Sequence, residues 1–297
     1  MVKRYDAGKI ITAMVTPFTK DLKVDYEACE ELTKHLIKTG SDSVLISGTT
    51  GESPTLSLDE KIELLASVKR AAANKAKVIF GAGSNSTENA IKLTKMAEKE
   101  GADAILSVVP YYNKPSQEGM IAHFSAIAKE TSLPIILYNI PGRTGVNMTV
   151  QTVKTLAENF ENIVGLKQSY FDLDVISELK LACPEDFTIY SGDDSLTLPM
   201  MALGAEGVIS VASHLWAGEI KTMIHNFETG NYIFAKNMHM KLYPIFKKLF
   251  MAPNPVPVKA ALEKAGIINS YVRLPLVQLN DEQKAELYSA IDKFTED

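Results

Sequence analysis

The chain has 297 residues, 46% of them hydrophobic, and a net charge of −5 at pH 7. This length allows one α/β barrel of about 250 residues with a small appendage. Lys and Arg are scattered among Asp and Glu without a basic stripe, so nucleic acid is not an expected partner. The apolar runs are too short to span a bilayer, so no membrane partner is expected either.

The two cysteines, Cys29 and Cys183, lie far apart and have no Cys-x-x-Cys spacing. This pattern argues against a disulfide framework and against a structural zinc site. We therefore expect reduced thiols and a cytoplasmic location. The N-terminal residues Met1 to Arg4 are basic, but no apolar stretch follows them, so they do not predict a signal peptide.

Eight short runs rich in β-branched and aliphatic residues recur along the chain. Most are continuously apolar, a pattern typical of parallel strands that are covered on both faces or line a closed barrel. The predicted strands are Ile10–Val15, Ser43–Ser47, Val78–Gly81, Ala104–Val109, Ile135–Ile140, Ile163–Lys167, Phe187–Ser191 and Gly207–Val211.

The segments between these strands have the spacing and capping residues of helices. Asp25 can cap a first helix that Gly40 ends, and Ser57 with Glu60 forms a capping box for a second. Alternating strands and helices predict a (β/α)8 TIM barrel over residues 1–230. Four helix-like stretches follow the eighth strand, and residues 231–297 are predicted to form a C-terminal helical region.

An open doubly wound sheet is the main alternative to the barrel. Such a fold would favour a nucleotide-binding loop after an early strand. Gly81 and Gly83 follow the third strand, but Ser86 stands where a Rossmann fingerprint needs its third glycine. No Gly-Lys-Ser/Thr sequence of the Walker type occurs either, which favours the barrel.

In barrels the ligand lies at the carboxyl ends of the strands, so the residues there are the first candidates for a site. Residues 48–53 (Gly-Thr-Thr-Gly-Glu-Ser) follow the second strand, and their hydroxyls and backbone N–H groups suit a small carboxylate. A tight turn with a cap for the next helix explains the same residues, and composition alone favours that explanation. Paired tyrosines, Tyr111 and Tyr112, follow the fourth strand and are commoner in packing than in catalysis.

Arg143 lies in a Gly-rich loop after the fifth strand, where its planar guanidinium could hold a carboxylate. A plain surface arginine is the commoner explanation. After the seventh strand, Asp193 and Asp194 could bind a metal, but a third ligand is lacking and helix capping fits them better. The five histidines form no His-Glu-x-x-His or Ser-His-Asp pattern, so none is assigned a role.

Lys167 ends an apolar strand, a position where lysine is rare unless it has a function. With a free pKa of about 10.4, a neutral amine costs roughly 4.6 kcal/mol at pH 7 in water. Desolvation at the mouth of a barrel could remove most of that cost and give a nucleophile able to form an imine with a keto acid. A strand-end lysine that extends to solvent is an equally good reading of position alone.

Five segments together resemble the dihydrodipicolinate synthase and N-acetylneuraminate lyase family over nearly the whole chain, from about Ile10 to Leu276. Each motif is weak alone, but their order and their places at predicted strand ends make the set specific. They are Gly-Thr-Thr-Gly-Glu-Ser-Pro-Thr at 48–55, Pro-Tyr-Tyr-Asn-Lys-Pro at 110–115, Tyr-Asn-Ile-Pro-Gly-Arg-Thr at 138–144, Gly-Leu-Lys at 165–167 and Gly-Val-Ile-Ser-Val at 207–211.

The resemblance implies a Schiff-base-forming lyase in which Lys167 forms an imine with pyruvate. Tyr138 would relay protons, with Thr49 and Tyr112 completing the relay. In this family the tyrosine matching Tyr112 commonly reaches into a neighbouring subunit. The resemblance therefore implies a homodimer, or a homotetramer built as a dimer of dimers. It implies no cofactor and no metal.

The same resemblance assigns substrate-binding residues. Thr50 would hold the pyruvate carboxylate, and Gly192 and Ile209 would line the pocket through their backbone carbonyls. Synthases of the family carry an arginine at the position of Arg143, where it holds the carboxylate of aspartate semialdehyde, whereas neuraminate lyases usually carry a small or apolar residue. Arg143 thus favours condensation of pyruvate with aspartate 4-semialdehyde, a step of diaminopimelate and lysine biosynthesis.

Two alternatives stay open. After Lys167, synthases usually read Glu-Ala-Thr/Ser-Gly, whereas residues 168–171 here are Gln-Ser-Tyr-Phe. A related class I aldolase that acts on N-acetylneuraminate or a 2-keto-3-deoxy sugar acid therefore remains possible. The second alternative, a barrel that binds a keto acid without turnover, has no need for a proton relay and is disfavoured.

Lysine-inhibited relatives bind lysine at the dimer interface, where Asn85 and Tyr111 match this site. Leu58 and Lys61 stand where sensitive members often carry histidines, and Asn89 where they often carry glutamate. Lys61 would repel the lysine ammonium and Asn89 lacks a negative charge, so the resemblance implies weak or absent lysine feedback.

Overall fold

A computed structural model describes residues 5–296 of the chain. The N-terminal residues Met1 to Arg4, which were not expected to form a signal peptide, lie outside this described part. Within residues 5–296 no helix is both long enough and apolar enough to cross a membrane.

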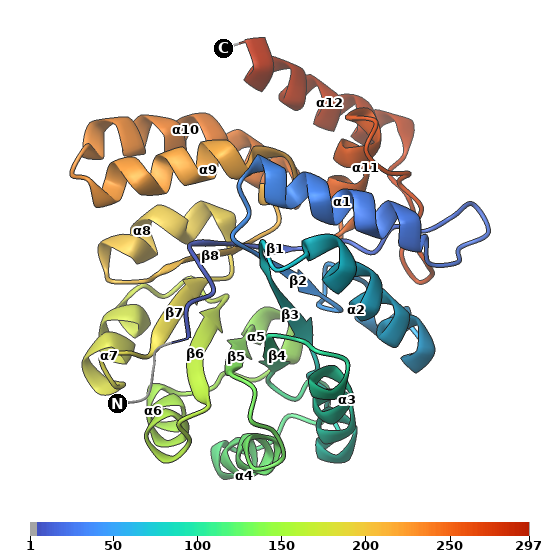
Figure 1. The fold of residues 1–297 in the computed structure, drawn as a ribbon. Coiled ribbons are helices and arrows are strands. Elements are labelled where there is room, and N and C mark those ends of the chain that lie inside the picture. The colour runs from blue at the N-terminus through green and yellow to red at the C-terminus, as the bar shows by residue number, and fades with distance from the viewer. Residues whose placement is uncertain (1–4, 297) are drawn as a thin grey trace.

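Eight parallel strands close into a barrel in which each strand pairs with the next and β8 pairs with β1. The predicted TIM barrel is confirmed (Figure 1), and each predicted strand overlaps an observed one. The strands are β1 (Ile10–Ala13), β2 (Ser43–Ile46), β3 (Lys77–Gly81), β4 (Ala104–Val108), β5 (Ile135–Asn139), β6 (Ile163–Gln168), β7 (Thr188–Ser191) and β8 (Gly207–Ser210).

Side chains alternate along each strand between the inside of the barrel and the layer of helices around it. Leu45, Ile79, Leu106 and Ile136 belong to an inner core. Their strand neighbours pack outward against the helices in a second, larger core. Because both faces of every strand are covered, the strands read as continuous apolar runs in the sequence.

Helices connect the strands and surround the barrel (Figure 1). Asp25 caps the first of them and Gly40 ends it, and Ser57 with Glu60 forms the predicted capping box at the start of the second. The helices between strands are α1 (Tyr26–Thr39), α2 (Leu58–Ala72), α3 (Thr87–Lys99), α4 (Gln117–Ala128), α5 (Pro141–Thr144), α6 (Val150–Asn159), α7 (Asp174–Ala182) and α8 (Thr197–Ala202), with short 3-10 turns η1 (Ser53–Thr55) and η2 (Asp194–Leu196).

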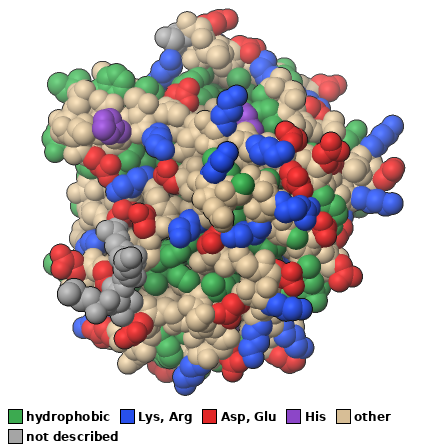
Figure 2. Space-filling view, in the orientation of Figure 1, with side chains coloured by type: hydrophobic (Ala, Val, Ile, Leu, Met, Phe, Trp, Pro, Cys, Tyr) green, Lys and Arg blue, Asp and Glu red, His purple; other side chains and the backbone are tan. Residues whose placement is uncertain are grey.

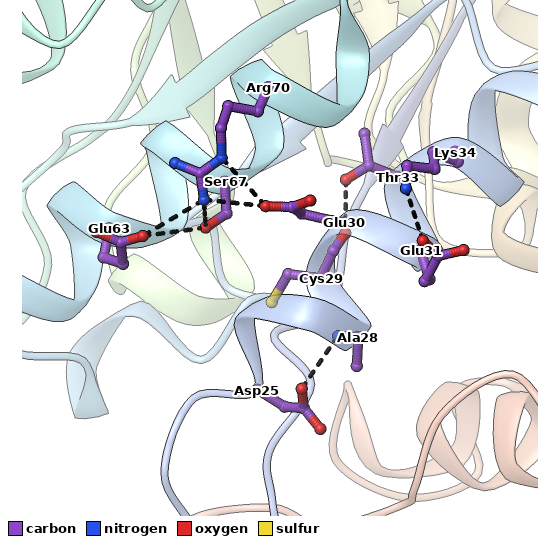
Figure 3. Close-up of polar contacts among 10 residues, drawn as sticks. All are labelled: Asp25, Ala28, Cys29, Glu30, Glu31, Thr33, Lys34, Glu63, Ser67 and Arg70. Atoms are coloured by element: carbon purple, nitrogen blue, oxygen red, sulfur yellow. Dashed lines mark hydrogen bonds and ion pairs between the residues drawn. The ribbon is translucent and has the colours of Figure 1, made fainter.

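Polar contacts at the surface join neighbouring helices, as Figure 3 shows for α1 and α2. The Asp25 carboxylate accepts a hydrogen bond from the Ala28 N–H at 3.0 Å. Arg70 of α2 donates to Glu30 of α1 at 2.9 Å and to Ser67 at 2.9 Å. Exposed ion pairs of this kind contribute at most about 1 kcal/mol, so burial of the apolar helix faces supplies most of the stability.

The helices after β8 are α9 (Ser213–Glu228), α10 (Tyr232–Lys248), α11 (Val256–Lys264) and α12 (Asp281–Glu296). Helix α10 packs along α9, and α12 contacts α10 and α11 on the outside of the molecule (Figure 1). We propose that the C-terminal region begins at residue 231, because from α10 onward the described helices follow α9 with no further strand between them. On the face in Figure 2, Lys and Arg side chains lie among Asp and Glu.

Candidate active site

A cavity of about 510 Å³ opens at the carboxyl ends of the strands. Its walls include residues at the ends of β2, β5, β6 and β7 and two residues of the C-terminal region, Phe250 and Asn254. This is the end of the barrel at which ligands bind in enzymes of this architecture. Six of the eight predicted site residues line it: Thr49, Thr50, Tyr138, Arg143, Lys167 and Gly192.

Lys167 projects into this cavity beside Tyr138. The two residues are direct partners in the ladder between β5 and β6, so both side chains face the same side of the sheet. The Lys167 Nζ lies 4.4 Å from the centre of the Tyr138 ring. Lys167 is 7% exposed, and within residues 5–296 its amine forms no ion pair. A buried amine without a fixed anion is available to react with a ligand.

The loop after β2 brings two threonines to the opposite wall. Thr50 is buried, and its hydroxyl oxygen accepts a hydrogen bond from Asn254 Nδ2 at 2.9 Å. Since that oxygen already accepts a bond, its own hydrogen is free to be donated to a ligand. Thr49 is exposed and lines the cavity with its neighbour. The Asn254 Oδ1 is buried and has no hydrogen-bond partner in the described part of the chain.

A buried ion pair with the C-terminal region holds this loop, residues 48–53, in place. Lys259 of α11 donates to Glu52 Oε1 at 2.6 Å and to the Tyr271 carbonyl at 2.7 Å. Glu52 has a left-handed backbone conformation (φ 53°), and its second oxygen accepts from the Arg273 N–H. Burial lowers the pKa of Lys259, and the Glu52 carboxylate opposes that shift. The C-terminal region therefore fixes the shape of the loop that carries Thr49 and Thr50, which we call the threonine loop.

Gly192 follows β7 and leaves room for the lysine. A methyl group built there would lie 1.9 Å from Ser169 Oγ and 3.0 Å from Lys167 Cε. The next residue, Asp193, accepts from the Ser195 N–H and so caps η2, as the sequence suggested. Its neighbour Asp194 is buried and accepts hydrogen bonds from Ser210 and from two backbone N–H groups of the β8 loop. Burial raises the pKa of the Asp194 carboxyl to about 6, and those hydrogen bonds oppose the shift.

Arg143 lies on the short helix α5 and faces two cavities. It lines the cavity of Lys167 and also a second one of about 530 Å³, which contains Leu58, Lys61 and Asn89. Within the described residues the Arg143 guanidinium forms no ion pair, so it is free to bind an anion. Burial lowers the pKa of Lys61, and no carboxylate lines the second cavity in residues 5–296.

Two predicted site residues lie elsewhere. Tyr112 is 90% exposed, outside both cavities, with a left-handed backbone conformation (φ 73°). Ile209 is buried in the inner core of the barrel and is not a lining residue of the cavity. The Tyr138 hydroxyl forms no hydrogen bond within residues 5–296. Hydrogen bonds within this chain therefore do not connect Thr49, Tyr138 and Tyr112 into the expected proton relay.

The sequence model of the dihydrodipicolinate synthetase family matches residues 6–294. The chain belongs to this family. A 4-hydroxy-tetrahydrodipicolinate synthase of Desulforamulus reducens is 53% identical over 273 residues, which cover 92% of each chain. One of Bacillus subtilis is 48% identical over 286 residues, covering 96% of this chain and 99% of the relative.

Solved structures agree with this placement in the dihydrodipicolinate synthetase family. A crystal structure of DHDPS from Cyanidioschyzon merolae with lysine bound has a TM-score of 0.95 to this chain. The two are 47% identical, and the match covers 97% of this chain and 98% of the other. The family resemblance predicted from the five motifs is therefore confirmed, and so is the fold that it implied.

Three contributors to the dihydrodipicolinate synthetase site escaped the reasoning from sequence. Asn254 and Phe250 come from the C-terminal region, which the sequence marked only as helical, and nothing in its pattern linked it to the strand ends. Ser169 lies in the segment 168–171 that departs from the family pattern, and that pattern gives its side chain no role. Strand alternation from Lys167 could have identified it.

Proposed function

We propose that Lys167 forms an imine with pyruvate and that the resulting enamine attacks aspartate 4-semialdehyde. The chain is a 4-hydroxy-tetrahydrodipicolinate synthase, a Schiff-base-forming lyase of lysine and diaminopimelate biosynthesis. The observation that carries the mechanism is the buried, unpaired Lys167 amine beside Tyr138 in the strand-end cavity. We propose that the enzyme acts in the cytoplasm and needs no cofactor.

The steps follow from the chemistry of these groups. The Lys167 amine adds to the pyruvate carbonyl, and loss of water gives the imine. The imine nitrogen makes the methyl group acidic because it accepts the electrons released when a proton leaves. Tyr138 is placed to move that proton, and Thr49 is the proposed second member of its relay. Thr50, with its oxygen held by Asn254, donates to the pyruvate carboxylate.

Substrate identity is tested by assay with three candidate reactions. We expect turnover of pyruvate with aspartate semialdehyde, and little or none in the cleavage of N-acetylneuraminate or of a 2-keto-3-deoxy sugar acid. The unpaired guanidinium of Arg143 supports this choice, because aspartate semialdehyde carries a carboxylate for it to bind. Faster turnover of either sugar acid would favour the aldolase alternative.

The Arg143→Ala variant is expected to lose about 10²-fold in kcat/KM for aspartate semialdehyde. A charge-assisted hydrogen bond contributes about 1.5–3 kcal/mol, and two of them form when the guanidinium holds a carboxylate at both oxygens. The KM for pyruvate should stay near the wild-type value. Arg143→Lys, which keeps the charge but not the planar fork, should recover only part of the loss. An equal rise in both KM values would contradict this role.

Tyr112 is proposed to act in the active site of a neighbouring subunit, in a homodimer or a homotetramer. Its full exposure on one chain supports this role. Tyr112→Phe and Lys167→Ala should each be nearly inactive alone. Mixing the two after dissociation and reassembly should restore activity, since one site of each hybrid dimer then has both wild-type residues. Sedimentation of the enzyme as an active monomer would contradict the proposal.

Lysine feedback is proposed to be weak or absent. The second cavity carries Lys61 and Lys92 and, in residues 5–296, no carboxylate to bind an ammonium group. We expect millimolar lysine to change the rate less than about 2-fold, because like charges repel in a partly buried site. A Lys61→His/Asn89→Glu double variant should become more sensitive. Strong inhibition of the wild type by sub-millimolar lysine would overturn the proposal.

A further inference from the structure

Ser169 continues strand β6 beyond Lys167 and faces the same side. Its backbone N–H donates to the Asn139 carbonyl at 2.9 Å, so the ladder with β5 extends past the end of the strand. Side chains two residues apart on extended backbone point the same way. Ser169 accordingly lines the cavity that contains Lys167 and Tyr138. It belongs to the segment 168–171, to which the mechanism above gives no role.

The Ser169 hydroxyl lies next to the end of the lysine side chain. One point, the position of an added methyl group at Gly192, is 1.9 Å from Ser169 Oγ and 3.0 Å from Lys167 Cε. The absence of a side chain at Gly192 thus lets the hydroxyl and the lysine methylene lie side by side. Lys167 Cε carries the reacting amine, so the hydroxyl is close to any group bonded to Nζ.

The same hydroxyl is buried and has no hydrogen-bond partner in the described residues. An unsatisfied buried polar group costs about 1–3 kcal/mol, so buried groups are nearly always paired. Ser107 and Thr94 also carry unpaired buried hydroxyls, but neither lines the cavity. Ser169 differs from them because its missing partner can come from a ligand.

We infer that the Ser169 hydroxyl donates a hydrogen bond to the keto-acid unit carried on Lys167, which makes Ser169 a further substrate-contacting residue. The inference rests on the proposed imine mechanism. When the amine adds to pyruvate, the carbonyl oxygen takes one amine proton and becomes the hydroxyl of a carbinolamine. That hydroxyl then leaves as water with the second amine proton, and the imine remains. That oxygen and the pyruvate carboxylate oxygens are the substrate oxygens nearest to Nζ. The aldehyde joins later at the pyruvate methyl carbon, which puts its oxygen more bonds away from Nζ.

The test measures trapping of the imine by borohydride with pyruvate alone, followed over time by intact mass. For Ser169→Ala we expect about a 10-fold slower formation of the adduct or an equal rise in the KM for pyruvate. The KM for aspartate semialdehyde should not change, and the thermal midpoint should not fall, because the removed hydroxyl has no partner in the protein. Ser107→Ala, which removes an unpaired hydroxyl of β4 outside the cavity, should match the wild type in every readout.

The outcomes separate this inference from the proposed function. No adduct with the wild-type protein would overturn the imine mechanism itself. A normal wild-type adduct with an unchanged rate and pyruvate KM in Ser169→Ala would overturn only the role of Ser169. A rise confined to the KM for aspartate semialdehyde would overturn it too, since the contact would then be with the second substrate.

Discussion

The Lys167→Ala variant should lose at least about 10³-fold in kcat, because the nucleophile that carries the substrate is removed. The cavity should otherwise stay intact, since the amine forms no ion pair within residues 5–296 whose loss would leave a charge unpaired. We therefore expect the thermal midpoint to stay close to that of the wild type. The measurement is steady-state turnover of pyruvate and aspartate semialdehyde, with the midpoint taken on the same samples.

Lys167→Arg is the matched control for charge. Its guanidinium keeps a positive charge at the strand end but does not form an imine at neutral pH. Loss of activity in both variants supports a covalent role. If Lys167→Arg kept more than a tenth of the wild-type activity, the lysine would act through its charge and the mechanism would be wrong.

The Lys259→Met variant is expected to lower the free energy of unfolding by about 3–5 kcal/mol. Lys259 and Glu52 have side-chain exposures of 0% and 2%, so removal of the cation leaves a carboxylate buried without its counter-charge. The threonine loop that contains Glu52 should loosen, and kcat/KM for pyruvate should fall together with stability. Urea unfolding at a fixed protein concentration measures the first effect.

Two controls isolate the buried pair. Lys264→Met breaks the more exposed pair with Asp292, at 2.8 Å, and should cost less than about 1 kcal/mol. A Glu52→Gln/Lys259→Met double variant should be more stable than Lys259→Met alone, because no unpaired charge remains. Equal losses for Lys259→Met and Lys264→Met would mean that the buried pair does not hold the loop.

The barrel was predictable because its strands are buried on both faces. This burial makes each strand a continuous apolar run, and the helices between them carry recognisable caps such as Asp25 and Ser57. The strand ends then indicated where Lys167, Tyr138 and Arg143 would meet. Position alone left Lys167 undecided between nucleophile and surface lysine, and only its place beside the other motifs resolved that choice.

The remaining parts of the site depend on contacts between distant segments. Asn254 meets Thr50 across 204 residues of sequence, and Lys259 meets Glu52 across 207. No local periodicity encodes such pairs, because each forms only after the C-terminal helices pack on the barrel. Tyr112 was predicted at the site but lies exposed on this chain, and its proposed role in a neighbouring subunit stays a prediction.

The most direct test of the central claim is reduction of the wild-type enzyme with borohydride in the presence of pyruvate, followed by intact mass and peptide mapping. The account predicts one pyruvate-derived adduct for each chain, located on Lys167 and absent from Lys167→Ala. An unmodified Lys167 in an enzyme that still turns over pyruvate and aspartate semialdehyde would contradict it.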